Sequence, residues 1–376
     1  MKSLLFITFL LHSVFGLIAQ KNPRDLDLKW KTDTNNTTIP LNEFTALMYA
    51  DGIPPIDDPD FYDLENAKKE YFAFEPVIAV EIDGKAKAYP LSVLMFHEIV
   101  NDSLGGTGIT VTYCPLCNSA LVFNRDLVYK GKSYHLDFGV SGMLRKSDMV
   151  MYDRQTESWW QQFMGEALVG ALMGAQLDII PAPVISLDEF AALYPNGRVL
   201  AKVLDDKGEA EFSYGHNPYV GYDDIAHEKP RLFFDEVDDR LPAMSRVVDV
   251  IVGQKHKIYP LKVVSKEKVI NDSFEQRPIS IFYTEKVVSV LDSADIKKSK
   301  TIGAVNVFWA EVDGRVLTFK KKKDDFIDHQ TKSVWNMKGE CIKGELKGKE
   351  LTTLPHGTHF AFAMFAFYPD ALIYKD

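Results

Sequence analysis

The stretch Ala88-Tyr-Pro-Leu-Ser-Val-Leu-Met-Phe-His-Glu-Ile-Val-Asn-Asp-Ser103 has a second version in the same chain, Ile258-Tyr-Pro-Leu-Lys-Val-Val-Ser-Lys-Glu-Lys-Val-Ile-Asn-Asp-Ser273. The two stretches lie 170 positions apart throughout. Seven of their 16 positions are identical, and four more exchange one aliphatic residue for another. Similarity kept in register over such a length indicates an internal repeat, and a repeat restricts the fold more than any local pattern does.

The correspondence extends well beyond this stretch. Ile109-Thr-Val-Thr-Tyr113 matches Ile279-Ser-Ile-Phe-Tyr283, and Asp153-Arg-Gln-Thr-Glu-Ser-Trp-Trp160 matches Asp328-His-Gln-Thr-Lys-Ser-Val-Trp335. Residues 165–174 match residues 339–348, Pro181 falls on Pro355, and the offset drifts only from 170 to 175. We therefore predict two tandem, diverged copies of one domain, at residues 76–200 and 241–376, packed about a pseudo-twofold axis.

Each copy is expected to be an α+β domain that is rich in strands. Asp83-Gly84 and Asp313-Gly314 each separate two short β-prone runs, which is typical of a hairpin turn. Strands are also expected over residues 109–113, 119–123 and 133–140. Short helices are expected at residues 91–100, directly after a proline, and before the two Tyr-Pro pairs, at residues 187–193 and 360–367. The glycine-punctuated run 165–174 is not expected to be helical.

Three segments lie outside the two copies. Residues 1–19 begin with one lysine, continue with an apolar run and end in small residues, which is the layout of a secretory signal peptide. The protein is therefore expected to be exported, to the periplasm or the extracellular space. Residues 20–75 form an N-terminal arm. Residues 201–240 form an acidic connector rich in tyrosine, glycine and proline, and it either covers a cleft or is a solvated linker.

Composition excludes two classes of partner. The net charge of −10 argues against nucleic acid, because binding phosphates requires a concentrated basic surface. The apolar run near the N-terminus is too short to span a bilayer, and no later segment is long and apolar enough to do so. The expected partner is a small ligand or a metal ion.

Cys114-Pro115-Leu116-Cys117 is the principal candidate for chemistry, because the second copy has Thr284 and Val287 at the two cysteine positions. What both copies keep is expected to be structural, whereas a feature of one copy needs its own explanation. Two thiols at this spacing can form a disulfide, bind a soft metal or exchange electrons as thiols. A thioredoxin-like mechanism needs a helix after the motif, and residues 118–123 look like a strand instead.

A histidine pair is the complementary feature of the second copy. His356 and His359 stand where the first copy has Ala182 and Ile185, so each copy contains one two-ligand motif that the other lacks. This complementarity suggests a shared metal site of Cys114, Cys117, His356 and His359, for which copper or zinc would be suitable. The alternative reading is a loop that leads into the next helix, with Thr358 as its cap.

Three further residues of the first copy are weaker candidates. His97, replaced by Glu267 in the second copy, could act in acid–base chemistry or be a surface residue of its helix. Arg145 and Asp148 follow a glycine-flanked segment and could bind an anionic ligand, or they could lie at a polar hairpin tip. The third cysteine, Cys341, replaces Ala167 and is expected to be a small buried residue.

Several of these motifs together resemble one bacterial family. Residues 80–91, His97 to Asp102, Thr112-Tyr-Cys-Pro-Leu-Cys-Asn-Ser-Ala120, Phe138-Gly-Val-Ser-Gly142, Asp153 to Trp159 and His356-Gly-Thr-His359 are similar to the family catalogued as domain of unknown function 3179. The resemblance covers nearly everything from about residue 76 to the end. It supports the domain assignment and the attention to the Cys and His pairs, but it implies no particular reaction.

Two hypotheses of function follow. In the first, Cys114 and Cys117 bind a transition metal or perform thiol redox chemistry, with possible help from His356, His359 and His97. In the second, the protein is a non-catalytic binding or scaffold protein, and Cys114 and Cys117 form a structural disulfide. Metal content and thiol oxidation state distinguish the two hypotheses.

Overall fold

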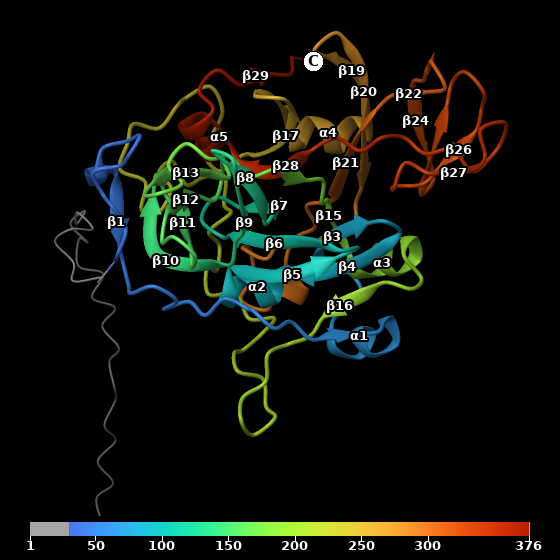
Figure 1. Ribbon diagram of the computed structural model, residues 1–376. Coiled ribbons are helices and arrows are strands. Elements are labelled where there is room, and N and C mark those ends of the chain that lie inside the picture. Colours follow the sequence, from blue (N-terminus) through green and yellow to red (C-terminus); the bar gives the residue numbers. More distant parts are fainter. Residues whose placement is uncertain (1–29, 376) are drawn as a thin grey trace, which may run out of the picture.

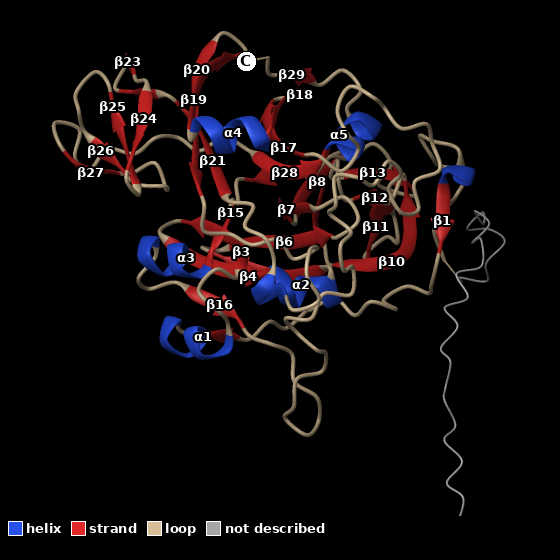
Figure 2. Ribbon diagram, turned by 180° about the vertical axis from the view of Figure 1, so that it is seen from behind, coloured by secondary structure: helices blue, strands red, loops and turns tan. Residues whose placement is uncertain are grey.

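The computed structural model describes residues 30–375, so the predicted signal peptide lies outside the described residues. The prediction of a β-rich α+β fold is confirmed, since strands and short helices of seven residues make up the regular structure (Figures 1 and 2). The arm contributes a short 3-10 helix at Leu41–Glu43, then β1 (Phe44–Ala46), β2 (Phe61–Tyr62) and α1 (Leu64–Glu70).

One series of five elements occurs at two places in the chain. The first series consists of β3 (Pro76–Ile82), β4 (Lys85–Pro90), α2 (Leu91–His97), β5 (Ile99–Leu104) and β6 (Thr107–Cys114). The second consists of β17 (Arg246–Val252), β18 (Lys255–Pro260), α4 (Leu261–Glu267), β19 (Val269–Phe274) and β20 (Arg277–Thr284). Each element of the second series has the same length as its counterpart and begins 170 residues after it.

The rest of the first half consists mainly of short strands. Its remaining elements are β7 (Ser119–Asn124), β8 (Asp126–Tyr129), β9 (Lys132–His135), β10 (Phe138–Arg145), β11 (Asp148–Asp153), β12 (Trp159–Gln161), β13 (Glu166–Val169), β14 (Ile179–Ile180), β15 (Val184–Ser186), α3 (Leu187–Leu193) and β16 (Arg198–Leu200). Together with the strands of the arm and of the first series, they form three sheets. The strand orders are β15-β3-β4-β16-β2, β14-β7-β6-β5 and β1-β10-β11-β12-β13. Strands β8 and β9 pair with each other in a separate two-stranded sheet.

The second half contains smaller sheets of related order. Its remaining elements are a 3-10 helix at Ile296–Lys298, β21 (Ala304–Trp309), β22 (Glu311–Val312), β23 (Arg315–Val316), β24 (Phe319–Lys322), β25 (Asp325–Asp328), β26 (Val334–Trp335), β27 (Cys341–Lys343), β28 (His356–Phe360), α5 (Ala361–Phe367) and β29 (Leu372–Ile373). The sheet orders are β28-β17-β18-β29, β19-β20-β21 and β24-β25-β26-β27, and β22 pairs with β23.

The Asn-Asp-Ser stretches that both halves contain form structural hydrogen bonds. The Asn101 amide exchanges two bonds with the main chain of Phe138, and the Asn271 amide exchanges two with that of Phe319. The following aspartate accepts a bond from a buried tyrosine and pairs with a lysine in each half, as Asp272 does with Tyr259 and Lys257. Asn101 is buried and Asn271 is exposed, but in both halves these hydrogen bonds tie neighbouring segments of the scaffold together.

Three predicted elements differ from the structure. The helix expected over residues 91–100 ends at His97, because Glu98 has a positive φ of 57° and the β-branched residues after it join β5. The strand expected over 133–140 is divided into β9 and the start of β10. The segment His356–Phe360 is strand β28 rather than a loop, so Thr358 does not cap the following helix, whose N-cap residue is Phe360.

One apolar core runs through both halves of the molecule. It contains Val111 and Trp160 from the first half together with Phe282 and Trp335 from the second. β28 pairs with β17 and also packs against β7, so the two halves meet at this strand (Figure 1). Among the described residues, no helix is long and apolar enough to cross a membrane.

Candidate functional site

Cys114 and Cys117 bound the tight turn that joins β6 to β7. Cys114 is the last residue of β6 and is paired with Ser119, and the Asn118 N–H donates to the Pro115 carbonyl across the turn at 3.2 Å. Both thiols are free and almost completely buried. The prediction that a strand rather than a helix follows the motif is confirmed by β7, so the thiols do not lie at a helix N-terminus.

Asp148 joins the two cysteines in one compact group. It begins β11 after Lys146 and Ser147, two residues with positive φ that turn the chain back toward the β6–β7 turn. Within the described part of the chain, Cys114, Cys117 and Asp148 form a group whose ligand atoms all lie within 4.8 Å of one another. All three side chains are buried.

Among the described residues, only one oxygen of the Asp148 carboxylate has hydrogen-bond partners. Its Oδ2 accepts a bond of 2.6 Å from the Gln161 Nε2 amide and one of 2.9 Å from the Phe163 main-chain N–H. Its Oδ1 is buried and has no hydrogen-bond partner among the described residues. A buried, unpartnered carboxylate oxygen next to two thiols is costly to desolvate and is a suitable ligand atom for a cation.

Burial shapes the acid–base properties of the group. It raises the pKa of the Cys114 thiol, raises that of Cys117 further, and raises the pKa of Asp148 to about 6. Glu98, which is buried nearby, has a pKa of about 8 because of burial and the charge of Asp148. Thiols with raised pKa values are poor nucleophiles, whereas a bound dication would favour their thiolate forms. The electrostatics therefore favour metal binding over thiol exchange.

The connector, residues 201–240, covers the two turns of the chain that contain Cys114, Cys117 and Asp148. The Tyr222 hydroxyl donates to the Leu116 carbonyl at 3.0 Å, and the Ser147 hydroxyl donates to the Arg231 carbonyl at 2.6 Å. Buried Asp223 fixes the connector to the second half through Arg246 and Lys300. This part of the connector is thus a packed cover rather than a solvated linker.

A cavity of about 1000 Å³ lies beneath the same cover. Its walls are mostly apolar, and Leu116 of the cysteine turn, Met149 and the connector residue Tyr219 contribute to them. The polar side chains in the wall are Glu98, Tyr219 and Arg231. Small-molecule sites typically combine an apolar wall with a few polar groups in this way.

The main chain of β28 lies against the cysteine turn, but its imidazoles are not members of the group. The Phe360 N–H donates to the Cys117 carbonyl at 3.0 Å, and the Asn118 amide donates to the Thr358 carbonyl at 2.9 Å. The His359 ring packs on the Phe163 ring with centroids 4.7 Å apart, and His356 Nδ1 bonds to the Leu354 carbonyl. The structure therefore brings the two predicted segments together, and within the described residues the group of possible ligands that contains the thiols includes neither imidazole.

His97 and Arg145 have partners of their own. His97 Nδ1 bonds to the Pro54 carbonyl at 2.8 Å and Nε2 to the Tyr214 hydroxyl at 2.7 Å. Arg145 pairs with Glu43 and also donates to Gln161, the residue that holds Asp148. Arg145 and Asp148 are the two residues expected to bind an anionic ligand. Asp148 lies in the cysteine group, and Arg145 is linked to it through hydrogen bonds with Gln161.

Sequence reasoning missed the link between Asp148 and the cysteines. The 30 or so residues that separate them hide it, and no spacing motif connects a turn after one strand to the start of another. The available signal was that Arg145-Lys-Ser-Asp148, like the Cys pair, has no clear counterpart in the second half.

Comparison with known proteins gives one result. A family model described as "Protein of unknown function (DUF3179)" matches residues 50–371. No curated protein and no solved structure matches the chain.

Proposed function

The chain belongs to the DUF3179 family, whose description assigns no function, and we propose from the site alone that it is an exported metal-binding protein. Cys114, Cys117 and Asp148 bind one transition metal ion, and the neighbouring apolar cavity receives a small molecule. The two halves are tandem copies of one domain, and only the first copy has acquired the metal ligands.

One observation is decisive for this proposal: two free thiols and an unpartnered carboxylate oxygen converge in a buried place. Zinc accepts sulfur and oxygen ligands together, whereas Cu(I) prefers an all-sulfur set, so zinc is the expected ion. Three protein ligands leave a fourth position for water or a ligand, which is the pattern of zinc sites that act on a substrate.

The cavity supports a role in which the metal and a ligand act together. Leu116 lies between the two cysteines and Met149 follows Asp148, and both line the cavity. A molecule in the cavity would therefore lie next to the metal-binding turns. The metal would supply Lewis acidity at the fourth position, while Glu98 and Tyr219 would orient the molecule.

The test is metal analysis of the exported protein after purification. The expected result is one zinc per chain, and zinc titration of chelator-treated protein should restore it. Cys114→Ser and Asp148→Asn should each abolish stoichiometric binding, because two ligands hold a transition metal much less tightly than three. Cys341→Ser is the matched control, since this third cysteine is also buried but lies outside the group, and it should retain the metal.

Two results would overturn the proposal. One is a protein that takes up neither zinc nor copper at stoichiometric level and has Cys114 and Cys117 oxidised to a disulfide, as thiol counting would reveal. The other is unchanged metal content in the Asp148→Asn and Cys114→Ser variants. If the protein contains copper instead of zinc, the proposed ligands remain the same and only the identity of the ion changes.

A further inference from the structure

A second cavity, of about 600 Å³, opens between the two halves on the side of β18. Its lining includes Glu166, Asp178 and Met164 from the first half, with His256, Trp309 and Tyr368 from the second. None of the described residues that line it is a lysine or an arginine. The metal-binding proposal uses none of these residues.

His256 and Asp249 form a buried pair at this cavity. His256 Nδ1 and Asp249 Oδ2 lie 2.8 Å apart across the β17–β18 hairpin, and the two side chains are only 6% and 2% exposed. The Tyr368 ring stacks on the imidazole with centroids 3.6 Å apart. Asp249 Oδ1 is buried without a partner among the described residues. When the Nδ1 proton is directed to the carboxylate, the Nε2 lone pair is free for a ligand.

The fold does not require this pair. The residues 170 positions earlier are Ala79 and Ala86, on the equivalent hairpin of β3 and β4. A buried carboxylate–imidazole pair with an unsatisfied oxygen contributes little or nothing to stability compared with small apolar residues. Its presence in one half alone therefore needs an explanation other than folding.

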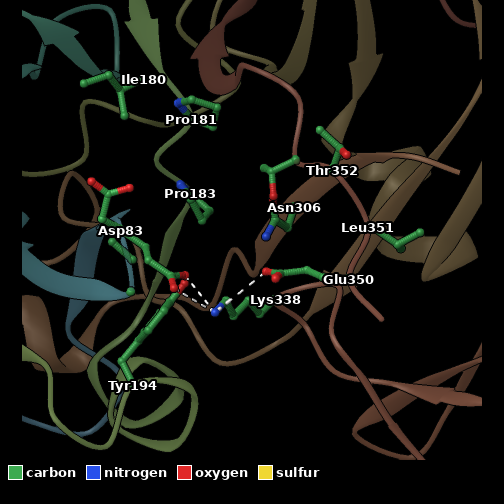
Figure 3. A pocket seen from close by; sticks show the side chains of 14 residues that line it. Asp83, Ile180, Pro181, Pro183, Tyr194, Asn306, Lys338, Glu350, Leu351 and Thr352 are labelled. Carbon is green, nitrogen blue, oxygen red and sulfur yellow. Dashed lines mark hydrogen bonds and ion pairs between the residues drawn. The ribbon is translucent and has the colours of Figure 1, made fainter. Parts of the chain in front are cut away.

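A cavity of about 440 Å³ lies at the place that corresponds to this one under the internal repeat, and residues of both halves line it too (Figure 3). It contains Tyr194, the counterpart of Tyr368, and Lys338, the counterpart of Met164. Lys338 Nζ pairs there with Glu81 at 2.9 Å and with Glu350 at 3.7 Å (Figure 3). At the His256 cavity, Met164 stands in place of that lysine, and Ile251 and Gln176 stand in place of its two acidic partners, so this ion-pair network is absent there.

We propose that the His256 cavity binds an organic ammonium ion with an apolar body. The ammonium group would donate to His256 Nε2 and pair with Glu166 and Asp178, which the first half contributes to the lining. Met164 and Trp309 would contact the apolar part. Charge complementarity argues for a cation, because two acidic side chains and no described lysine or arginine line the cavity.

The test compares three probes of one shape: 2-phenylethylammonium, 2-phenylethanol and 3-phenylpropionate. Calorimetric titration of the full chain should give a Kd for the ammonium ion at least tenfold lower than for the alcohol, and no binding of the carboxylate. Asp178→Asn changes an exposed residue and cannot prevent folding, so it should weaken ammonium binding at least threefold. Asp249→Ala combined with His256→Ala reproduces the residues of the first half and should abolish binding.

Thermal denaturation provides the second readout. The double alanine variant should melt no lower than the wild type, since the pair is a binding feature rather than a structural one. Lys338→Met, in the other cavity, is the matched control and should leave ammonium binding unchanged. Preference for the carboxylate probe, unaltered binding in the double variant, or a melting temperature lowered by more than five degrees would each overturn the proposal. Zinc content is measured separately and does not depend on these results.

Discussion

Gln161 orients the Asp148 carboxylate, which is one of the three ligands of the proposed metal site. Its amide and the Phe163 N–H hold Oδ2, and Oδ1 has no hydrogen-bond partner among the described residues. We expect Gln161→Met to retain all three ligands but to weaken zinc affinity about 10- to 100-fold, as the loss of an orienting hydrogen bond typically does. Competition with a chromogenic chelator measures this change.

Gln155→Met is the control for that variant. Gln155 also donates its amide to an aspartate, Asp137, but at an exposed place, and Asp137 is not a member of the cysteine group. Its zinc affinity should match that of the wild type. Equal affinities in all three proteins would show that Asp148 needs no orienting partner.

The buried carboxyl group of Glu75 is expected to make the folding stability of the protein depend on pH. It is fully buried, which raises its pKa to about 7, above the ordinary value of 4.5. As the pH rises from about 4.5 to 7, the unfolded chain ionises this group while the folded protein does not, so stability is lost across that interval and then levels off. Glu75→Gln removes this loss, and above pH 7 it should stabilise the protein by up to about 3 kcal/mol.

Urea denaturation at pH 4.5 and at pH 7.5 tests the Glu75 prediction. The gain from Glu75→Gln should be absent or small at the lower pH and large at the higher one. Glu209→Gln, at an exposed connector position, should show no such difference between the two conditions. A constant offset at both pH values would mean that the folded state holds Glu75 ionised.

The cysteine turn could be found from the sequence, and Asp148, the third member of the group, could not. Comparison of the two halves singled out Cys114 and Cys117, because the second half has Thr284 and Val287 at those positions. Asp148 reaches them only through the pairing of β10 with β11 and the two positive-φ residues before it, and these are features of tertiary structure. The same comparison predicted that the Cys segment and the His segment lie together, and their main chains do. The directions of the side chains, however, determine which ligand atoms can bind the same metal ion.

At the level of elements, the connector is expected to control access to the metal. Tyr222 links it to the cysteine turn through the 3.0 Å bond to the Leu116 carbonyl. Tyr222→Phe should lower the free energy of unfolding by about 1 kcal/mol and should also speed the release of zinc to a chelator several-fold. Stopped-flow transfer to a fluorescent chelator measures the release rate.

A tyrosine elsewhere allows the two effects to be separated. The Tyr71 hydroxyl donates to the Leu200 carbonyl at 2.8 Å, in a buried place at the other end of the first half. Tyr71→Phe should cost similar stability and leave the release rate unchanged. If both variants release zinc equally fast, general loosening rather than the connector controls release.

Local sequence signals located most elements but not all of their ends. The Asp-Gly turns and the helix at Leu187–Leu193 lie where the pattern predicts, because turn chemistry and helix periodicity act over a few residues. α2 ends earlier than the pattern indicates. Its last predicted residues pair with β6 instead, and partners that lie distant in the sequence override local helix propensity.

On the scale of the whole molecule, the sequence predicts an α+β protein with two similar series of elements. It does not predict how the halves meet, since that depends on contacts between residues far apart in the chain. Lys338 pairs with Glu81, and the Thr284 hydroxyl donates to Glu189, each across the two halves. Together with the shared apolar core, these contacts join the halves into one unit.

A shared core should make unfolding cooperative. Phe282 and Trp335 belong to the same continuous core as Val111 and Trp160, so neither half can unfold without exposing apolar surface of the other. We expect metal-free protein to show a single calorimetric transition, with equal calorimetric and van't Hoff enthalpies. Asn101→Ala and Asn271→Ala each remove two main-chain hydrogen bonds, in different halves, and each should cost about 2 kcal/mol. Both variants should shift that one transition down by a few degrees, whereas independent halves would give two transitions, with each substitution moving a different one.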